Sequence, residues 1–192
     1  MKNVLERKMP TALGIILILG TIIGTTFLVK TGVIYLGGAA PSDNPKNVRI
    51  SNISDSSLTV SYNTDAAVIG TVSIGKDKNS LETILDERDQ KSGTPQQYKL
   101  HSITIQNLSP NTQYVFSITS GATTYLNNNS FFTTKTAPTL STSPTSQPPL
   151  TGSIVSPDGT APQEALVYLT TNKGQLLSTL TKPSGIYTIP LN

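Results

Sequence analysis

Short runs in which apolar and polar residues alternate constrain the fold of this chain more than any other feature. Leu58, Val60 and Tyr62 alternate with Thr59 and Ser61. The same pattern recurs at 48–50, 72–74, 103–105 and 114–119. Successive side chains of a strand point to opposite faces, so each run predicts an antiparallel strand with one buried and one solvent-exposed face. Turn-forming residues separate the runs, and this spacing predicts an all-β sandwich over residues 45–137.

Composition excludes several classes of function. Charged residues make up 13% of the chain, against about 25% in ordinary soluble domains. There is no cysteine, which excludes disulfides, zinc–thiolate sites and thiol nucleophiles. The net charge of +3 belongs to residues 1–40, because residues 41–192 carry ten basic and ten acidic side chains. The basic balance therefore gives no support to a nucleic-acid partner, which requires clustered Lys and Arg on the folded part.

An uncharged apolar run of 18 residues, Ala12 to Val29, predicts a membrane anchor. A bilayer core needs about 20 such residues in a helix. We expect a transmembrane helix over 11–36, with the lipid bilayer as its partner, and a juxtamembrane linker over 37–44. Basic residues before the run place residues 1–10 in the cytoplasm and the rest of the chain outside. The alternative is a signal peptide cleaved near Gly37–Ala40, which would release a secreted protein.

The segment from Leu108 to Tyr114 is the most specific string in the chain. Its pattern, L-x-P-x-T-x-Y with Pro110 and Thr112, resembles the turn before strand F of fibronectin type III domains. The resemblance implies that Leu108 fills the core beneath the turn and that the Tyr114 hydroxyl reaches back to nearby backbone. Tyr62 stands where that family usually has Trp. These five residues form a structural signature rather than a catalytic site.

The stretches 72–75, 85–89 and 98–105 are similar to one variant of this family, the domain that precedes the catalytic domain of purple acid phosphatases. The metal-binding half of those enzymes needs clustered His, Asp and Asn, and this chain has one histidine. We expect His101 to be a solvent-facing or hydrogen-bonded strand residue, and the Asp86–Asp89 run to be a solvated loop rather than a calcium site. The residues therefore predict that the chain has no catalytic site, binds no metal or cofactor, and is not an enzyme.

Two further segments follow the first sandwich. Residues 138–149, rich in Pro, Ser and Thr, predict an extended linker. Residues 150–192 resemble the carboxypeptidase regulatory-like (transthyretin-like) sandwich, with expected strands at 150–155, 165–169, 176–181 and 186–189. That family usually has about seven strands, so we expect an incomplete second β-sandwich. Either the chain is a fragment, or something else completes the open face of this sandwich.

Two functions from different classes agree with these features. The first is a non-catalytic cell-surface stalk or adhesion module, suggested by the anchor and the serial sandwiches. The second is the accessory and anchoring region of an exported hydrolase whose catalytic domain lies beyond residue 192, suggested by the phosphatase-like variant. A third, weaker interpretation is a carbohydrate-binding module, for which Tyr98 and Tyr125 are the loop-like aromatic candidates.

Overall fold

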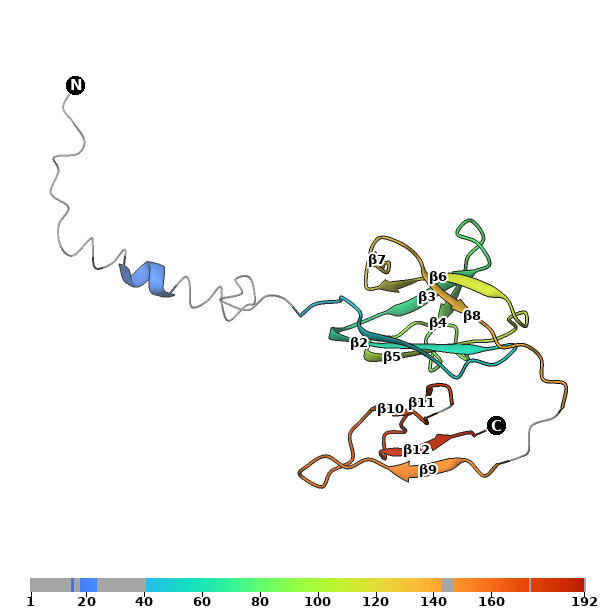
Figure 1. Ribbon diagram of the computed structural model, residues 1–192. Coiled ribbons are helices and arrows are strands. Elements are labelled where there is room, and N and C mark those ends of the chain that lie inside the picture. The colour runs from blue at the N-terminus through green and yellow to red at the C-terminus, as the bar shows by residue number, and fades with distance from the viewer. Residues whose placement is uncertain (1–14, 16–17, 24–40, 143–146, 173, 192) are drawn as a thin grey trace. The chain divides into compact units, whose positions relative to one another are not determined.

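The computed structural model describes residues 15, 18–23, 41–142, 147–172 and 174–191 (Figure 1). The chain divides into two compact units, Met1–Ala40 and Pro41–Asn192. In the first unit, the described residues are helical. Among all described residues, no helix is long and apolar enough to cross a membrane. Residues 1–10, most of the predicted anchor over 11–36 and the first half of the linker over 37–44 lie outside the described residues.

Residues 45–137, the first module, form two antiparallel sheets that face each other. Sheet A has the order β1 (Lys46–Ser51), β2 (Leu58–Val68) and β5 (Tyr98–Ile105). Sheet B has the order β4 (Glu82–Leu85), β3 (Gly70–Gly75), β6 (Gln113–Ser120) and β7 (Thr123–Tyr125), and β8 (Phe132–Lys135) also pairs with β6. All pairs are antiparallel, so the predicted all-β architecture is confirmed for this module. The short strands β4 and β7 were not predicted.

The core of the first module lies between the inner faces of the two sheets. Its buried side chains are Leu58, Val60, Tyr62, Val72, Ile74, Ile103, Ile105, Tyr114, Phe116 and Ile118. These residues occupy the apolar positions of the alternating runs, so the predicted inner face is confirmed. Burying a side chain of this kind stabilises the fold by about 1.5–3 kcal/mol.

The prediction that the polar face of sheet A is exposed to solvent is wrong for the middle of β2 and β5, although Arg49 on β1 is exposed. Thr59 and Ser61 are 2% and 0% exposed, and Ser102 on β5 is 2% exposed. The cause is a second layer, because the Ser61 hydroxyl lies 2.9 Å from the hydroxyl of Tyr168, far along the chain. The polar alternation therefore marks a hydrogen-bonded face that other parts of the chain cover.

Residues 150–192, the second module, contain four strands in two antiparallel pairs. β9 (Leu150–Ser153) pairs with β12 (Ile186–Ile189), and β10 (Leu166–Leu169) pairs with β11 (Leu177–Leu180). These strands match the four that the sequence predicted. Ile189 is buried, whereas Leu150, Val155 and Ile186 remain exposed.

Hydrogen bonds join the second module to sheet A. The side-chain amide of Asn52 donates to the Ser178 carbonyl at 2.9 Å and accepts from the Ser178 N–H at 2.9 Å. The N–H of Asn52 donates to the Leu176 carbonyl at 3.0 Å, and the Ser51 and Ser178 hydroxyls lie 2.6 Å apart. Asn52 has a φ of 52°, a conformation that asparagine tolerates better than most residues. Asn52 therefore joins the end of β1 to the main chain of β11.

Candidate functional site

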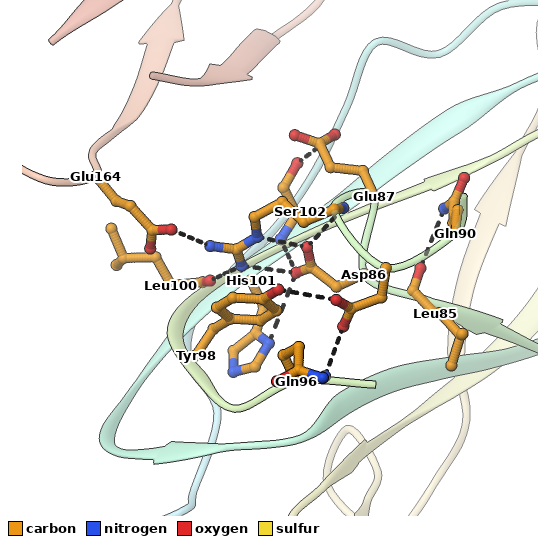
Figure 2. Close-up of polar contacts among 12 residues, drawn as sticks. Leu85, Asp86, Glu87, Gln90, Gln96, Tyr98, Leu100, His101, Ser102 and Glu164 are labelled. Carbon is orange, nitrogen blue, oxygen red and sulfur yellow. Dashed lines mark hydrogen bonds and ion pairs between the residues drawn. The ribbon is translucent and has the colours of Figure 1, made fainter. Parts of the chain in front are cut away.

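A cluster of charged side chains beside β5 contains the residues most able to do chemistry (Figure 2). Asp86 and Asp89 lie in the loop between β4 and β5 and are only 1% and 3% exposed. The expectation of a solvated loop at 86–89 is therefore wrong for these two carboxylates. The Asp86 carboxylate accepts hydrogen bonds from Nε of Arg88 at 2.8 Å, from Nη2 at 3.0 Å and from the Ser102 N–H at 3.0 Å. These contacts compensate the burial of its charge.

Arg88 connects this cluster to the second module. Its Nη1 donates to Oε1 of Glu164, and its Nη2 donates to the Leu100 carbonyl. The guanidinium lies over the ring of Tyr98, with Cζ 3.4 Å from the ring centroid. Burial lowers the pKa of Arg88, but the hydrogen bonds to Asp86 and Glu164 outweigh it and raise the pKa above its ordinary value. Arg88 is therefore a permanent cation that ties two carboxylates together.

The same loop satisfies main-chain groups along the outer edge of β5. Arg88 binds the Leu100 carbonyl, and Asp86 binds the Ser102 N–H. The Ser102 carbonyl accepts from the Glu87 N–H at 2.9 Å, and the Thr104 carbonyl accepts from Nε2 of Gln90 at 2.9 Å. We call residues 86–90 the edge cap. An uncovered edge strand invites pairing with other chains, so this arrangement of charges protects the sheet.

His101 lies in the core of the first module and is fully buried. Its ring stacks on Tyr62, with the ring centroids 4.5 Å apart, and Nδ1 lies 3.8 Å from Oδ2 of Asp86. Neither ring nitrogen, nor the Tyr62 hydroxyl, has a hydrogen-bond partner within the described part of the chain. Burial lowers the pKa of His101 to about 4, against the attraction of Asp86. The expectation of a solvent-facing or hydrogen-bonded histidine is wrong.

This geometry does not suit His101 to acid–base catalysis. A general base must reach the proton that it abstracts in a plausible substrate pose. His101 is sealed from solvent, and the hydroxyl of its neighbour Tyr62 is held protonated because burial raises the pKa of Tyr62. The described residues contain no group of three or more His, Asp or Glu side chains placed to hold a metal ion. The arrangement of the cluster is that of a structural tie.

The structural signature residues lie at the turn before β6. The Ser109 N–H donates to the Tyr114 hydroxyl at 2.8 Å, and the Thr112 hydroxyl donates to the Pro110 carbonyl at 2.8 Å. Leu108 is partly buried against the core. Tyr62, on β2, lies elsewhere in the core beside His101. The signature therefore divides into a hydrogen-bonded corner and a separate aromatic pair.

Both candidate aromatic platforms for a sugar are held by internal contacts. Tyr98 begins β5, donates its hydroxyl to Oδ1 of Asp89 at 2.8 Å and has Arg88 over its ring. Tyr125 ends β7 and donates its hydroxyl to Oδ1 of Asp43 at 2.7 Å. Both residues were expected in loops, and both lie in strands instead. Because Arg88 covers a ring face of Tyr98, the carbohydrate-binding interpretation loses its better candidate.

Sequence reasoning missed the residues that connect the cluster. Arg88, Gln90 and Asn52 were not singled out for a role, and their partners lie from 2 to 126 positions away in the chain. One signal was present, because Arg88 is a single cation within an otherwise acidic run. In such a run the cation can pair with a neighbouring carboxylate as readily as all of the side chains can remain in solvent. Nothing in the local pattern indicates which carbonyls it would cap.

The two facing antiparallel sheets and the corner at Tyr114 define the first module as a fibronectin type III-like β-sandwich. Residues 45–136 match the family model described as the purple acid phosphatase N-terminal domain. This match agrees with the resemblance that the sequence predicted for this module. A comparison with curated protein sequences found no match.

Several solved structures are similar to this chain. The sensor domain of the anti-sigma factor RsgI4 from Pseudobacteroides cellulosolvens is 18% identical, with 49% of this chain and 98% of that chain covered and a TM-score of 0.33. The central fibronectin III array of RIM-binding protein is 16% identical, with 77% and 51% covered and a TM-score of 0.33. The FN1–FN3 domains of chicken CNTN1 are 15% identical, with 76% and 53% covered and a TM-score of 0.32.

Proposed function

We propose that this chain is a non-catalytic cell-surface protein, a stalk or interaction module anchored through residues 11–36 with residues 41–192 outside the cell. The observation that carries the proposal is that the charged side chains of the cluster beside β5 bind other groups of the chain. Arg88 binds both Asp86 and Glu164, and His101 is sealed in the core. The charged groups of this cluster are thus engaged with one another within the first module, and Arg88 also holds Glu164 of the second module.

The contacts between the modules suit a spacer. Asn52 pairs with the main chain of Ser178, and Arg88 pairs with Glu164. The guanidinium of Arg49 also lies over the ring of Tyr168, 4.6 Å from its centroid. Several separate contacts resist bending at the junction better than a linker alone. On this proposal the second module is a carboxypeptidase regulatory-like sandwich that extends the arm.

Labelling of single cysteines in intact cells tests the location. The natural chain has no cysteine, so each variant reports one position. We expect Ser141→Cys, in an exposed part of the linker, to react with a membrane-impermeant maleimide in intact cells. Asn3→Cys should react only after the membrane is permeabilised. Labelling of Asn3→Cys but not Ser141→Cys in intact cells would overturn the proposed orientation, and recovery of Ser141→Cys in the medium would indicate a cleaved signal peptide.

The family match favours a second candidate, the accessory and anchoring region of an exported hydrolase. On this proposal the chemistry lies outside residues 1–192, because His101 is buried and neutral. Phosphate-ester hydrolysis by the complete gene product would support this candidate, provided that His101→Gln leaves the rate unchanged. A gene product that folds and is exported but hydrolyses no ester would leave the stalk proposal in place.

A further inference from the structure

The edges of the two sheets in the first module are treated unequally. β5 is covered by the edge cap, residues 86–90. β1 carries Lys46 and Arg49 and has an irregular register between them, and charges and bulges both discourage edge pairing. β4 pairs with β3 on one side, and no strand among the described residues pairs with its other side. β4 contains neither Lys nor Pro, and its register with β3 is regular.

The main chain of β4 shows which groups face outward. The Leu85 carbonyl accepts from Nε2 of Gln90 at 3.0 Å, and the same Nε2 binds Thr104 on β5. The Leu85 carbonyl therefore points away from β3, and in a strand the main-chain groups two residues earlier point the same way. This places the N–H and C=O of Thr83 on the open edge. A groove of about 730 Å³ lies beside this edge, lined by both β4 and the end of β5.

We propose that β4 pairs in antiparallel fashion with β4 of a second copy of this chain, in a register centred on Thr83. Thr83 then faces Thr83 of the second copy, and each N–H donates to the opposite carbonyl. Leu81 faces Leu85 of the second copy, and Glu82 faces Ile84. Sheet B continues from one copy into the other, across a two-fold axis that makes the interface self-complementary.

The chemistry of the edge selects this occupant. Free main-chain groups on a strand are satisfied by another extended main chain, which excludes a helix or a small apolar ligand. The single charge of β4 is Glu82, and the register centred on Thr83 keeps the two Glu82 carboxylates from facing each other. Threonine pairs and apolar pairs across antiparallel strands are favourable, whereas like charges directly opposite are not. The β4 sequence thus fits its own copy, and this inference does not depend on the proposed function.

A cysteine pair provides the test, because the natural chain has no cysteine. In the proposed dimer the two Thr83 Cα atoms are about 5.5 Å apart, within the range of about 4.4–6.8 Å that a disulfide requires. The matched control is Ser73→Cys. Ser73 pairs with Thr83 across β3 and β4, and their hydroxyls lie 3.0 Å apart, so each variant loses the same hydrogen bond. Two Ser73 residues would lie roughly 14 Å apart, three strand spacings, and could not be bridged.

The full chain is purified in detergent, mildly oxidised and separated on a non-reducing gel, which shows whether a disulfide dimer has formed. We expect Thr83→Cys to form a disulfide dimer and Ser73→Cys to remain monomeric, with both variants folded by circular dichroism. Thr83→Lys should weaken self-association in sedimentation equilibrium relative to Ser73→Lys. Equal dimer yields at both cysteine positions, or no dimer at either, would overturn the proposal. Crosslinking of Thr83→Cys to a different protein in the producing cell would also overturn it, by assigning the edge to another partner.

Discussion

At the scale of single residues, His101 makes stability depend on pH. Its pKa is about 4 in the folded chain, against about 6.5 when unfolded. The unfolded state therefore binds the proton more tightly, so stability falls as the pH drops from 6.5 towards 4 and is unaffected by this group above 6.5. A difference of this size corresponds to about 3 kcal/mol.

Urea unfolding at pH 7, 5.5 and 4.5 checks this prediction. His101→Gln lacks the titrating group, so it should lose less stability than the natural chain over this range. Burial raises the pKa of Glu87, and its contribution has the opposite sign, but it is present in both proteins and cancels in the comparison. Parallel curves for the two proteins would contradict a buried neutral His101.

Gly70 is a second position where a single added atom is expected to change the stability of the chain. A Cβ added at Gly70 would overlap the Tyr62 hydroxyl and Nδ1 of His101. We expect Gly70→Ala to destabilise the chain by about 1–3 kcal/mol, because overpacking a filled core forces side chains from their positions. Thermal unfolding of Gly70→Ala, Tyr62→Phe and the double variant measures this. The double variant should recover part of the loss, and simple additivity would show that the hydroxyl is not the obstacle.

At the scale of elements, the edge cap depends on the pairing of Asp86 with Arg88. Arg88→Met leaves the buried Asp86 carboxylate without its cation, and breaking a buried pair from one side costs about 3–5 kcal/mol. We expect a loss of this size in urea unfolding, with faster hydrogen exchange of the Ser102 amide, which Asp86 binds. Asp86→Asn combined with Arg88→Met removes both charges and should lose less than Arg88→Met alone. A double variant less stable than Arg88→Met would exclude an uncompensated carboxylate as the cause.

The elements also show how far sequence reasoning reaches. Alternating runs identified β2, β5 and β6 and the side chains of the core, because a period of two is imposed by the strand itself. β4 was missed because only four residues pair there, too few to show a period. The edge cap was missed because its hydrogen bonds join groups far apart in sequence. Burial of Thr59 and Ser61 could not be predicted either, since it requires knowing what lies on that face.

At the scale of the whole molecule, the Asn52 side chain makes one of the contacts that join the two modules. Asn52→Gly removes two hydrogen bonds with the Ser178 main chain, together with those to the Ser178 and Thr59 hydroxyls. It keeps the positive φ accessible. We expect a loss of about 1–3 kcal/mol at the junction, since each such bond contributes about 0.5–1.5 kcal/mol. Hydrogen exchange of β11, Leu177–Leu180, should be about tenfold faster or more, while β6 stays protected.

Asn107→Gly is the matched control for this experiment. Asn107 also has a positive φ, 60°, but it is exposed and makes no hydrogen bond with the described residues of the second module. Both variants gain the same backbone freedom when unfolded, so the difference between them isolates the hydrogen bonds of Asn52. If β11 exchanges equally fast in both variants, the Asn52 side chain does not hold the modules together, and a rigid stalk would have to rest on the other contacts, such as Arg88 with Glu164 and Ser61 with Tyr168. If β11 exchanges hydrogen more slowly in Asn107→Gly than in Asn52→Gly, the result supports one continuous arm built from both sandwiches.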